Sequence, residues 1–160
     1  MIVQVDNYEQ LNICCEIIQK SFLTVAEEFG ITKNNCPSYT GFITIDKLRK
    51  QFDEDKLMFL YYDGNIPVGY FSLSEGSDGE WELNNLAVLP ELRHLGIGKS
   101  LVDFATEKIK ENNGNKIYLG IVEENVRLKK WYEKLGFVHI GVKKFENLPF
   151  TVGFMKKRIK

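Results

Sequence analysis

Apolar residues in the first third of the chain recur every three or four positions, the spacing of an amphipathic helix. This spacing predicts a helix that begins at about residue 8 and ends at Gly30. It also predicts a second helix, which Thr44 caps and which runs through Phe52. A short strand at residues 2–5 precedes the first helix. The segment between the helices, residues 31–43, carries asparagine, proline and glycine and is predicted to be a loop.

The middle of the chain changes to strand-like spacing. Strands are predicted at residues 57–62, 66–73 and 80–89. The first two flank Asp63-Gly64-Asn65, a strong hairpin signal because glycine adopts the positive φ that such turns need. Three consecutive strands joined by short turns form a meander, which stops at Pro90.

Helix and strand patterns alternate in the second half. We expect helices at residues 98–112 and 125–135, the second capped by Asn125, and strands at residues 116–122, 137–145 and 151–156. The order β-α-α-β-β-β-α-β-α-β-β predicts an α/β fold, a mixed sheet with helices on both faces. No repeat, low-complexity stretch or linker divides the chain, so residues 1–160 are expected to form a single domain.

Composition narrows the classes of function. The net charge of −1 argues against bulk attraction to nucleic acid or to an anionic membrane. No apolar run reaches the roughly 18 residues of a membrane span, and no secretory signal is visible. The three cysteines are interpreted as reduced thiols of a cytoplasmic protein. Without a CxxC pair, and with His94 and His139 as the only histidines, no metal site is expected.

The most informative segment ends the meander and reads Leu86-Ala87-Val88-Leu89-Pro90-Glu91-Leu92-Arg93-His94-Leu95-Gly96-Ile97-Gly98-Lys99. A strand ends, a short loop follows, and two glycines open a helix. The start of a helix offers free N–H groups and a partial positive charge, and glycines let a phosphate oxygen approach closely. The segment therefore favours a phosphate-binding turn, although an ordinary strand-to-helix turn without ligand has the same local pattern.

Two other phosphate-binding motifs fit this segment poorly. A P-loop would need glycine at the position of Arg93. A dinucleotide-binding turn would need a small residue at the position of Leu101, and it would need an earlier parallel βαβ unit. Neither motif is therefore predicted.

A wider pattern resembles the GNAT superfamily of N-acetyltransferases. The segment that begins at Leu86 matches the acetyl-CoA-binding segment of this family, with the pattern L-A-V-x-P-x-x-R-x-x-G-x-G-K. Its second signature is matched by N-x(6)-Y-x-x-x-G-F, which begins at Asn125. The two motifs have the order and spacing of the family, and the predicted elements match along nearly the whole chain. The resemblance implies the GNAT acyl-CoA N-acyltransferase fold.

The resemblance also implies which residues hold acetyl-CoA. In the family, backbone groups at the end of the meander pair with the pantetheine arm, which here means Leu86, Ala87 and Val88. N–H groups of the loop hold the pyrophosphate, which here means Arg93, His94, Leu95, Gly96, Ile97, Gly98 and Lys99. His94 stands where many members carry Arg or Lys, so its charge depends on pH. Asn125 is expected near the arm of the coenzyme, besides capping its helix.

Glu82 is the first candidate for the base that deprotonates the acceptor. An ammonium group of pKa near 10.4 is deprotonated at pH 7 at a cost of roughly 4 kcal/mol, and a carboxylate is the simplest helper. Some GNAT members carry a base at this position, and period-two alternation is expected to place Glu82, Asn84 and Leu86 on one side of the strand. Glu80 and Glu75 are weaker alternatives, and an exposed carboxylate without a role fits the sequence too.

Tyr132 occupies the position at which the family usually places its general acid. A phenol of pKa near 10 is less acidic than a thiol near 8.5, so we expect a hydrogen bond to the leaving sulfur, with or without completed proton transfer. Because Leu128, Tyr132 and Leu135 continue one apolar face, a purely structural role fits as well.

The resemblance thus implies an acyltransferase that moves the acetyl group of acetyl-CoA to a primary amine of a small molecule or protein, by direct attack in a ternary complex. A catalytically silent module that senses acyl-CoA is the alternative. The strand at residues 116–122 lacks the Glu of some protein-modifying members, which disfavours a protein amino-terminal acetyltransferase.

The sequence leaves the acceptor and the assembly open. The resemblance implies an acceptor pocket at residues 22–42 and 145–152. Glu27, Glu28, Phe29 and Tyr39 there would suit a cation, although the two glutamates also fit a solvated helix face, and the loop Leu148-Pro149-Phe150 also fits a dimer contact. Both monomer and homodimer are compatible with the sequence, as is a donor longer than acetyl.

Overall fold

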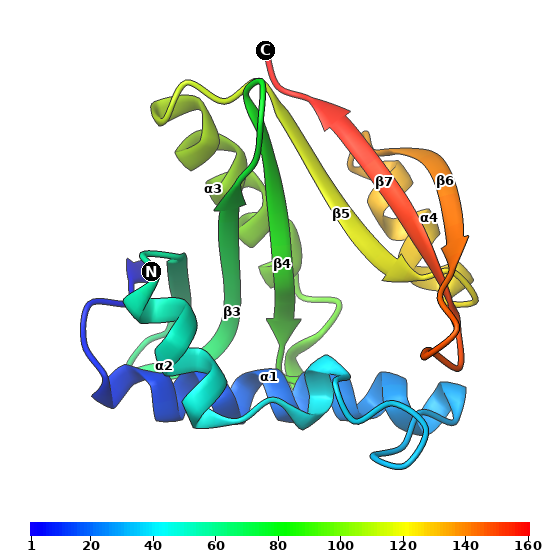
Figure 1. Ribbon diagram of the computed structural model, residues 1–160. Coiled ribbons are helices and arrows are strands. Elements are labelled where there is room, and N and C mark those ends of the chain that lie inside the picture. The colour runs from blue at the N-terminus through cyan, green and yellow to red at the C-terminus, as the bar shows by residue number, and fades with distance from the viewer.

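The computed structural model describes all residues, 1–160, and follows the predicted order of elements (Figure 1). Its strands form one seven-stranded sheet in the order β1-β2-β3-β4-β5-β7-β6. All neighbouring strands are antiparallel except β4 and β5, which run parallel. The strands are β1 (Ile2–Gln4), β2 (Leu57–Asp63), β3 (Ile66–Glu75), β4 (Glu80–Val88), β5 (Lys116–Val122), β6 (Val138–Lys144) and β7 (Thr151–Arg158).

Four helices and two short 3-10 turns connect the strands, and residues with clear local preferences mark several ends. Gly30 takes the left-handed conformation after the first helix, and the Thr44 side chain accepts a hydrogen bond from the N–H of Lys47 at the start of the second. These ends, and the β2–β3 turn at Gly64 with a φ of 62°, confirm the predictions. The helices are α1 (Glu9–Phe29), α2 (Ile45–Asp53), α3 (Ile97–Glu111) and α4 (Val126–Lys134), and the turns are Thr40–Phe42 and Pro90–Leu92.

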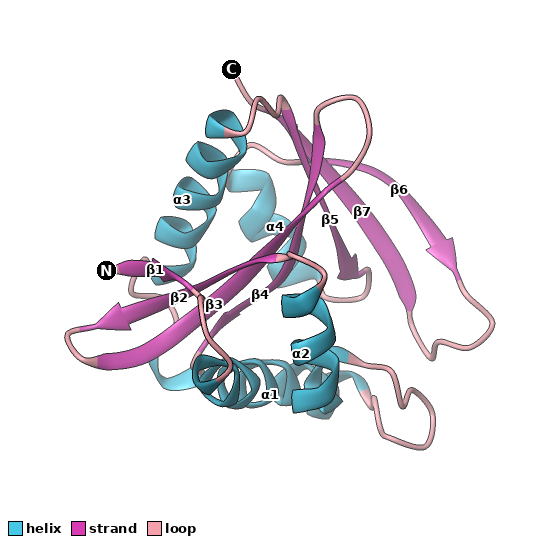
Figure 2. Cartoon of the chain, turned by 60° about the vertical axis from the view of Figure 1, so that its left-hand side comes forward, coloured by secondary structure: helices cyan, strands magenta, loops and turns pink.

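The helices cover both faces of the sheet (Figure 2). On one face, α1 and α2 bury a core that includes Leu11, Leu48 and Tyr70. On the other, α3 and α4 bury a larger core that includes Leu101 and Phe71. Full burial of one such side chain stabilises the fold by about 1.5–3 kcal/mol, so the two cores fix the sheet between its helices. The predicted mixed α/β architecture is confirmed.

A third, smaller cluster joins segments that are far apart in the sequence. Its buried members come from the end of α1, the loop that follows and the end of β5, and they are Ala26, Ile31, Cys36, Tyr39 and Val122. Phe22 of α1 and Leu148 and Phe150 of the β6–β7 loop pack against them. The cluster therefore brings the α1–α2 loop and the β6–β7 loop together.

Two further observations bear on the environment of the chain. Cys14, Cys15 and Cys36 are buried free thiols, as predicted. None of the helices combines the length and apolar character that a membrane span requires.

Candidate active site

The neighbouring strands β4 and β5 part after three residue pairs. Pairing joins residues 80–82 to residues 116–118, although β4 continues to Val88 and β5 to Val122. Figure 1 shows the two strands diverging beyond that point. The later part of β4 keeps its pairing with β3 but has no strand on the side of β5. An edge with unpaired N–H and C=O groups can take up an extended ligand as if it were another strand.

A β-bulge lies in β4 where the strands part. Ser72 of β3 pairs with Asn84, whereas Tyr70 pairs with Ala87, so β4 holds one extra residue. Asn85 within the bulge has a φ of 52°, a left-handed conformation that asparagine adopts more readily than most residues. A bulge bends its strand and disrupts the ladder locally, which fits the divergence of β4 from β5.

The bulge corrects one prediction about side-chain direction. Leu86 packs against the core under α3 and α4, the same core that contains Trp81 and Leu83. Glu82 and Asn84 alternate with those residues and point to the opposite face of the sheet. The prediction that Glu82, Asn84 and Leu86 share one side is therefore wrong, because the extra residue reverses the alternation.

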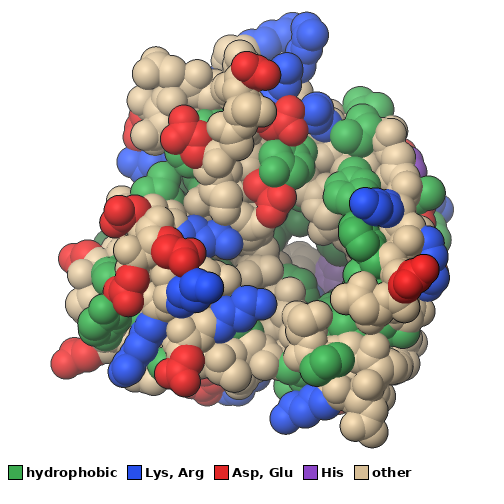
Figure 3. Space-filling model, viewed as in Figure 1, with side chains coloured by type: hydrophobic (Ala, Val, Ile, Leu, Met, Phe, Trp, Pro, Cys, Tyr) green, Lys and Arg blue, Asp and Glu red, His purple; other side chains and the backbone are tan.

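A cleft of about 1070 Å³ opens between the parted strands. Its walls come from α1 and the loop after it, the ends of β4 and β5, the start of α3, α4 and the β6–β7 loop. Figure 3 shows it as a hollow in the surface between the two halves of the molecule. Pockets for one small ligand span about 300–1,000 Å³, so this cleft has room for an extended ligand and a second, smaller one.

The start of α3 presents free amides to the cleft. Gly96 precedes the helix with a φ of 86°, and both Gly96 and Gly98 line the cleft. The N–H groups of residues 94–99 donate no hydrogen bond to another backbone group. A Cβ on Gly96 would meet no protein atom within 4 Å, so the space beside it is open. This arrangement suits an anionic group such as a diphosphate.

The side chains of this loop differ in what they can add. His94 lines the cleft and has a φ of 66°. Leu95 is exposed, whereas the side chain of Ile97 is buried in the core, so both can serve a ligand only through their backbone. Lys99 lines the cleft and pairs with Asp103 at 2.7 Å on the exposed surface of α3.

Gly98 also lets α3 approach α4. A Cβ at this position would lie 3.0 Å from Cζ2 and 3.2 Å from Cη2 of Trp131. Trp131 in turn packs edge-on against Tyr132, with ring centroids 4.9 Å apart. Gly98 therefore controls the position of two aromatic residues of the cleft as well as access to the free amides.

Arg93 points toward α1. Its Nη1 donates to Oγ1 of Thr24 at 3.0 Å, and its Nη2 donates to the carbonyl oxygen and the hydroxyl of Ser21 at 2.8 and 3.1 Å. Partial burial lowers the pKa of Arg93, which the carboxylate of Glu91 partly opposes, but a guanidinium stays charged at neutral pH. Arg93 therefore fastens the loop before α3 to α1 and holds the free amides in place.

Basic side chains outnumber acidic ones along the cleft. Glu28 is its one carboxylate, and that carboxylate lies 2.6 Å from Nη2 of Arg127. The basic lining residues, besides His94, are Arg93, Lys99, Arg127, Lys130 and Lys134. The excess of positive charge favours an anionic ligand.

Tyr132 joins the core and the cleft. It is only 5% exposed, and its ring packs against Trp131 and Phe137. Nevertheless it lines the cleft, and its hydroxyl forms no hydrogen bond with the protein. Burial raises the pKa of Tyr132 above its ordinary value, so the hydroxyl keeps its proton and remains a donor at neutral pH.

The other predicted contacts of the coenzyme arm surround the same cleft. Asn125 caps α4 as predicted, because its Oδ1 accepts a hydrogen bond from the N–H of Leu128 at 3.3 Å, and it also lines the cleft. Leu86 and Val88 line the cleft, whereas the side chain of Ala87 is buried in the core under α1 and α2. Ala87 itself does not line the cleft.

Glu82 lies beside the point where the strands part but does not line the cleft. It is the last residue of β4 that pairs with β5, opposite Tyr118. The pKa of Tyr118 is raised to about 12 by burial and then by the negative charge of Glu82. The two alternative candidates for the base are Glu80, whose carboxylate lies 3.0 Å from Nζ of Lys156, and Glu75, which is exposed.

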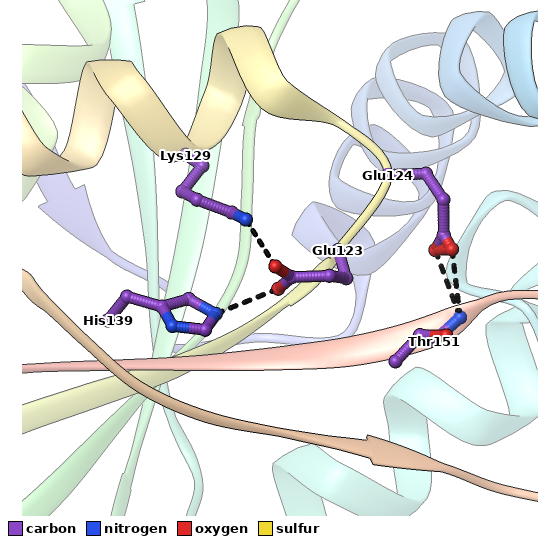
Figure 4. Close-up of polar contacts among 5 residues, drawn as sticks. All are labelled: Glu123, Glu124, Lys129, His139 and Thr151. Atoms are coloured by element: carbon purple, nitrogen blue, oxygen red, sulfur yellow. Dashed lines mark hydrogen bonds and ion pairs between the residues drawn. The ribbon is translucent and has the colours of Figure 1, made fainter.

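Sequence analysis missed an ion cluster at the end of β5 (Figure 4). The carboxylate of Glu123 pairs with the ammonium group of Lys129 on α4 and, at 2.9 Å, with Nε2 of His139 on β6. Burial acts to raise the pKa of Glu123, but the bonds from Lys129 and His139 outweigh it and lower that pKa. Glu124 accepts a hydrogen bond from the N–H of Thr151 at 3.0 Å.

These contacts fix the turn between β5 and α4, which carries Asn125, against β6 and β7. None of the cluster residues lines the cleft. No local signal reveals the cluster, because its partners lie 6 and 16 residues from Glu123 on different elements. The structure contains no group of three or more His, Cys, Asp or Glu side chains that could hold a metal ion.

Comparison with known proteins places this geometry in a family. The family model described as "Acetyltransferase (GNAT) family" matches residues 21–137. A Lactobacillus delbrueckii subsp. lactis protein, described as an uncharacterized N-acetyltransferase in the pepI 3′ region, is 29% identical in an alignment of length 144, and the match covers 79% of this chain and 79% of that protein.

Two solved structures share the fold over the whole chain. The ribosomal-protein-S18-alanine N-acetyltransferase of Escherichia coli superposes with a TM-score of 0.76 at 16% identity, covering 100% of this chain and 94% of that one. An aminoglycoside 6′-N-acetyltransferase complexed with coenzyme A gives 0.72 at 20% identity, covering 100% and 97%. At such low identity the likeness establishes the fold and leaves the acceptor open.

Proposed function

The chain belongs to the GNAT family of acetyltransferases and is an acetyl-CoA-dependent acyltransferase, and we propose that it moves the acetyl group to a primary amine while both substrates are bound. The observation that carries this proposal is that three features meet in one cleft. They are the unpaired edge of β4, the free amides before α3 and the hydroxyl of Tyr132. A sensor of acyl-CoA requires the first two, whereas the third supplies what acyl transfer needs in addition.

In this proposal the protein binds acetyl-CoA mainly through backbone groups. We assign the pantetheine arm to the unpaired edge at Leu86, Ala87 and Val88, with Asn125 beside it. We assign the pyrophosphate to the free amides of residues 94–99, where Lys99 adds positive charge, whereas the N–H of Arg93, also predicted for this role, donates to the carbonyl oxygen of Pro90 at 3.4 Å. Hydrogen bonds to a charged acceptor contribute about 1.5–3 kcal/mol each, so a few of these amides suffice to anchor the coenzyme.

The transfer itself makes one bond and breaks one. The nitrogen of the neutral amine bonds to the carbonyl carbon of the thioester, the carbon–sulfur bond breaks, and the bonding electrons leave with the sulfur. The nitrogen loses one proton, and the coenzyme sulfur finally gains one. In our proposal the hydroxyl of Tyr132 donates a hydrogen bond to that sulfur as its negative charge develops. The support is that this hydroxyl belongs to a residue that lines the cleft and has no hydrogen-bond partner within the protein.

Proton removal is assigned to Glu82, acting through water. Its side chain faces away from Leu86, which places it on the α1 and α2 side of the sheet, at the last pair before the strands part. A carboxylate there can accept a proton relayed from the acceptor without touching the coenzyme. Positioning of the two substrates contributes to the rate whether or not this relay operates.

We propose that the 160 residues act as one acetyltransferase domain in the cytoplasm, as a monomer or homodimer. Three buried free thiols support a reducing compartment.

Steady-state kinetics test the proposed function. Purified protein is incubated with acetyl-CoA and a panel of primary amines, and release of free coenzyme A thiol is followed. We expect acceptor-dependent thiol release, and intersecting double-reciprocal lines when both substrates are varied, as a ternary complex requires. Parallel lines would reject direct attack, and tight coenzyme binding without thiol release for any amine would favour the sensor.

A further inference from the structure

The end of the cleft away from α3 has a distinct chemistry. It is walled by side chains from α1, the loop after α1, the end of β5 and the β6–β7 loop. We call it the aromatic end, and it consists of Phe22, Val25, Tyr39, Val122, Leu148 and Phe150. Apolar side chains from four segments thus meet where a second substrate would reach the coenzyme.

The rings of the aromatic end pack against one another and together line one wall of the cleft. Tyr39 lies edge-on to Phe22 and to Phe150, with ring centroids 6.2 Å away in each pair. Phe22, Leu148 and Phe150 remain partly exposed although they pack against the third core cluster. A cluster that only stabilised the fold would gain by burying these side chains fully, whereas here they line an open cavity.

The aromatic end offers no free negative charge. Glu27 is exposed and does not line the cleft. Glu28 lines it but is paired with Arg127, and the remaining charged groups of the lining are basic. An acceptor with several ammonium groups needs several carboxylates to replace its hydration, and this cleft does not provide them.

Neutral polar groups complete the site. Thr40 and Asn85 both line the cleft. The distance between Oγ1 of Thr40 and Oδ1 of Asn85 is 3.5 Å. Asn85 sits in the bulge of β4, where the strands part. An uncharged hydroxyl and amide can orient one amine nitrogen, but they cannot balance additional charges.

We propose that the acceptor is a small monoamine with an apolar body of aromatic size, bound against Phe22, Tyr39 and Phe150. This inference rests on the proposed function and adds the class of acceptor. It departs from the interpretation in which Glu27 and Glu28 bind a cationic acceptor, and favours the alternative in which both belong to a solvated helix face. It also sets this chain apart from two proteins that share its fold and whose names refer to an aminoglycoside or to an alanine of ribosomal protein S18.

A panel of four acceptors tests the proposal in the intact protein. The probes are 2-phenylethylamine, n-butylamine, the dication 1,4-diaminobutane and a peptide with an N-terminal alanine, each at saturating acetyl-CoA. We expect kcat/KM for 2-phenylethylamine to exceed that for n-butylamine about tenfold or more, as burial of a ring implies. The dication and the peptide are expected to rank below n-butylamine.

A matched pair of variants locates the preference in the aromatic end. Phe150→Ala removes a ring from the lining. Phe145→Ala removes a ring from the same β6–β7 loop, at a residue that the sequence placed in the acceptor pocket but that does not line the cleft in the structure. We expect Phe150→Ala to lower the ratio of the 2-phenylethylamine and n-butylamine kcat/KM values about fivefold or more. Phe145→Ala should leave that ratio unchanged. Thermal melting and the dissociation constant of coenzyme A verify that both variants keep the fold and the coenzyme site.

The outcomes separate this inference from the proposed function. Thiol release that is fastest with 1,4-diaminobutane or with the peptide would overturn the aromatic acceptor while leaving acetyl transfer in place. An equal loss in the two variants would overturn the assignment to Phe150. Absence of thiol release with every amine would refute the proposed function, and the acceptor class with it.

Discussion

Replacing Tyr132 by phenylalanine removes one hydroxyl and nothing else. The ring keeps its packing against Trp131 and Phe137. Because the hydroxyl has no partner in the protein, its loss breaks no internal hydrogen bond. We therefore expect the melting temperature of Tyr132→Phe to equal or slightly exceed that of the wild type. A residue that serves only the core would show no other effect.

The effect on the rate follows from the hydrogen bond assigned to the leaving sulfur. Such a bond to a charged acceptor contributes about 1.5–3 kcal/mol, and each 1.4 kcal/mol corresponds to a factor of about ten. Tyr132→Phe is therefore expected to lower kcat about 10- to 150-fold. Because the bond forms as charge develops, the dissociation constant of acetyl-CoA should change less than about twofold.

Thiol release at saturating substrates, calorimetry with coenzyme A and thermal melting measure the three quantities. Tyr62→Phe is the matched control, since Tyr62 lies on β2 outside the cleft. An unchanged kcat in Tyr132→Phe would refute the reasoning and leave Tyr132 a core residue. An equal fall in kcat and coenzyme affinity would indicate lost binding in place of lost stabilisation of the departing sulfur.

Four further predictions concern other parts of the structure. Gly98→Ala places a methyl group 3.0 Å from Trp131, so calorimetry should show coenzyme A affinity reduced about tenfold. Glu82→Gln should lower kcat/KM with coenzyme affinity retained, and an unchanged rate would assign the proton to solvent. Glu123→Gln should destabilise the fold at neutral pH, with the difference in denaturation midpoints shrinking below about pH 4.5, because the lowered pKa stabilises only the ionised form. Above about pH 10 the unfolded chain loses tyrosine protons that buried Tyr39 and Tyr70 retain, so denaturant titrations should show the free energy of unfolding falling by up to about 1.4 kcal/mol per pH unit for each.

The helices and strands were predictable because their ends carry local signals. Gly30, Thr44 and Asn125 each stabilise a helix end through their own backbone or side chain, and these preferences act within a few residues. The free amides before α3 belong to the same class, since Gly96 and the strand-to-helix turn are contiguous in sequence.

Features that depend on distant partners escaped prediction. The bulge at Asn85 exists only relative to the register with β3, so the sequence of β4 alone predicted uninterrupted alternation. Arg93 occupies a motif position, yet the direction of its side chain is set by a hydrogen bond to Ser21, 72 residues earlier. The pairing of Glu28 with Arg127 spans 99 residues, which is why Glu28 looked available to a cationic acceptor.

Binding of coenzyme A to the purified, folded protein tests the central claim most directly, namely that the parted strands and the start of α3 form one site for a nucleotide thioester. Isothermal titration should show one coenzyme per chain, with a dissociation constant between about 1 μM and 1 mM that rises with salt. In the Gly98→Ala variant the constant should rise further. A flat titration at millimolar coenzyme A with the folded wild-type protein would contradict the account.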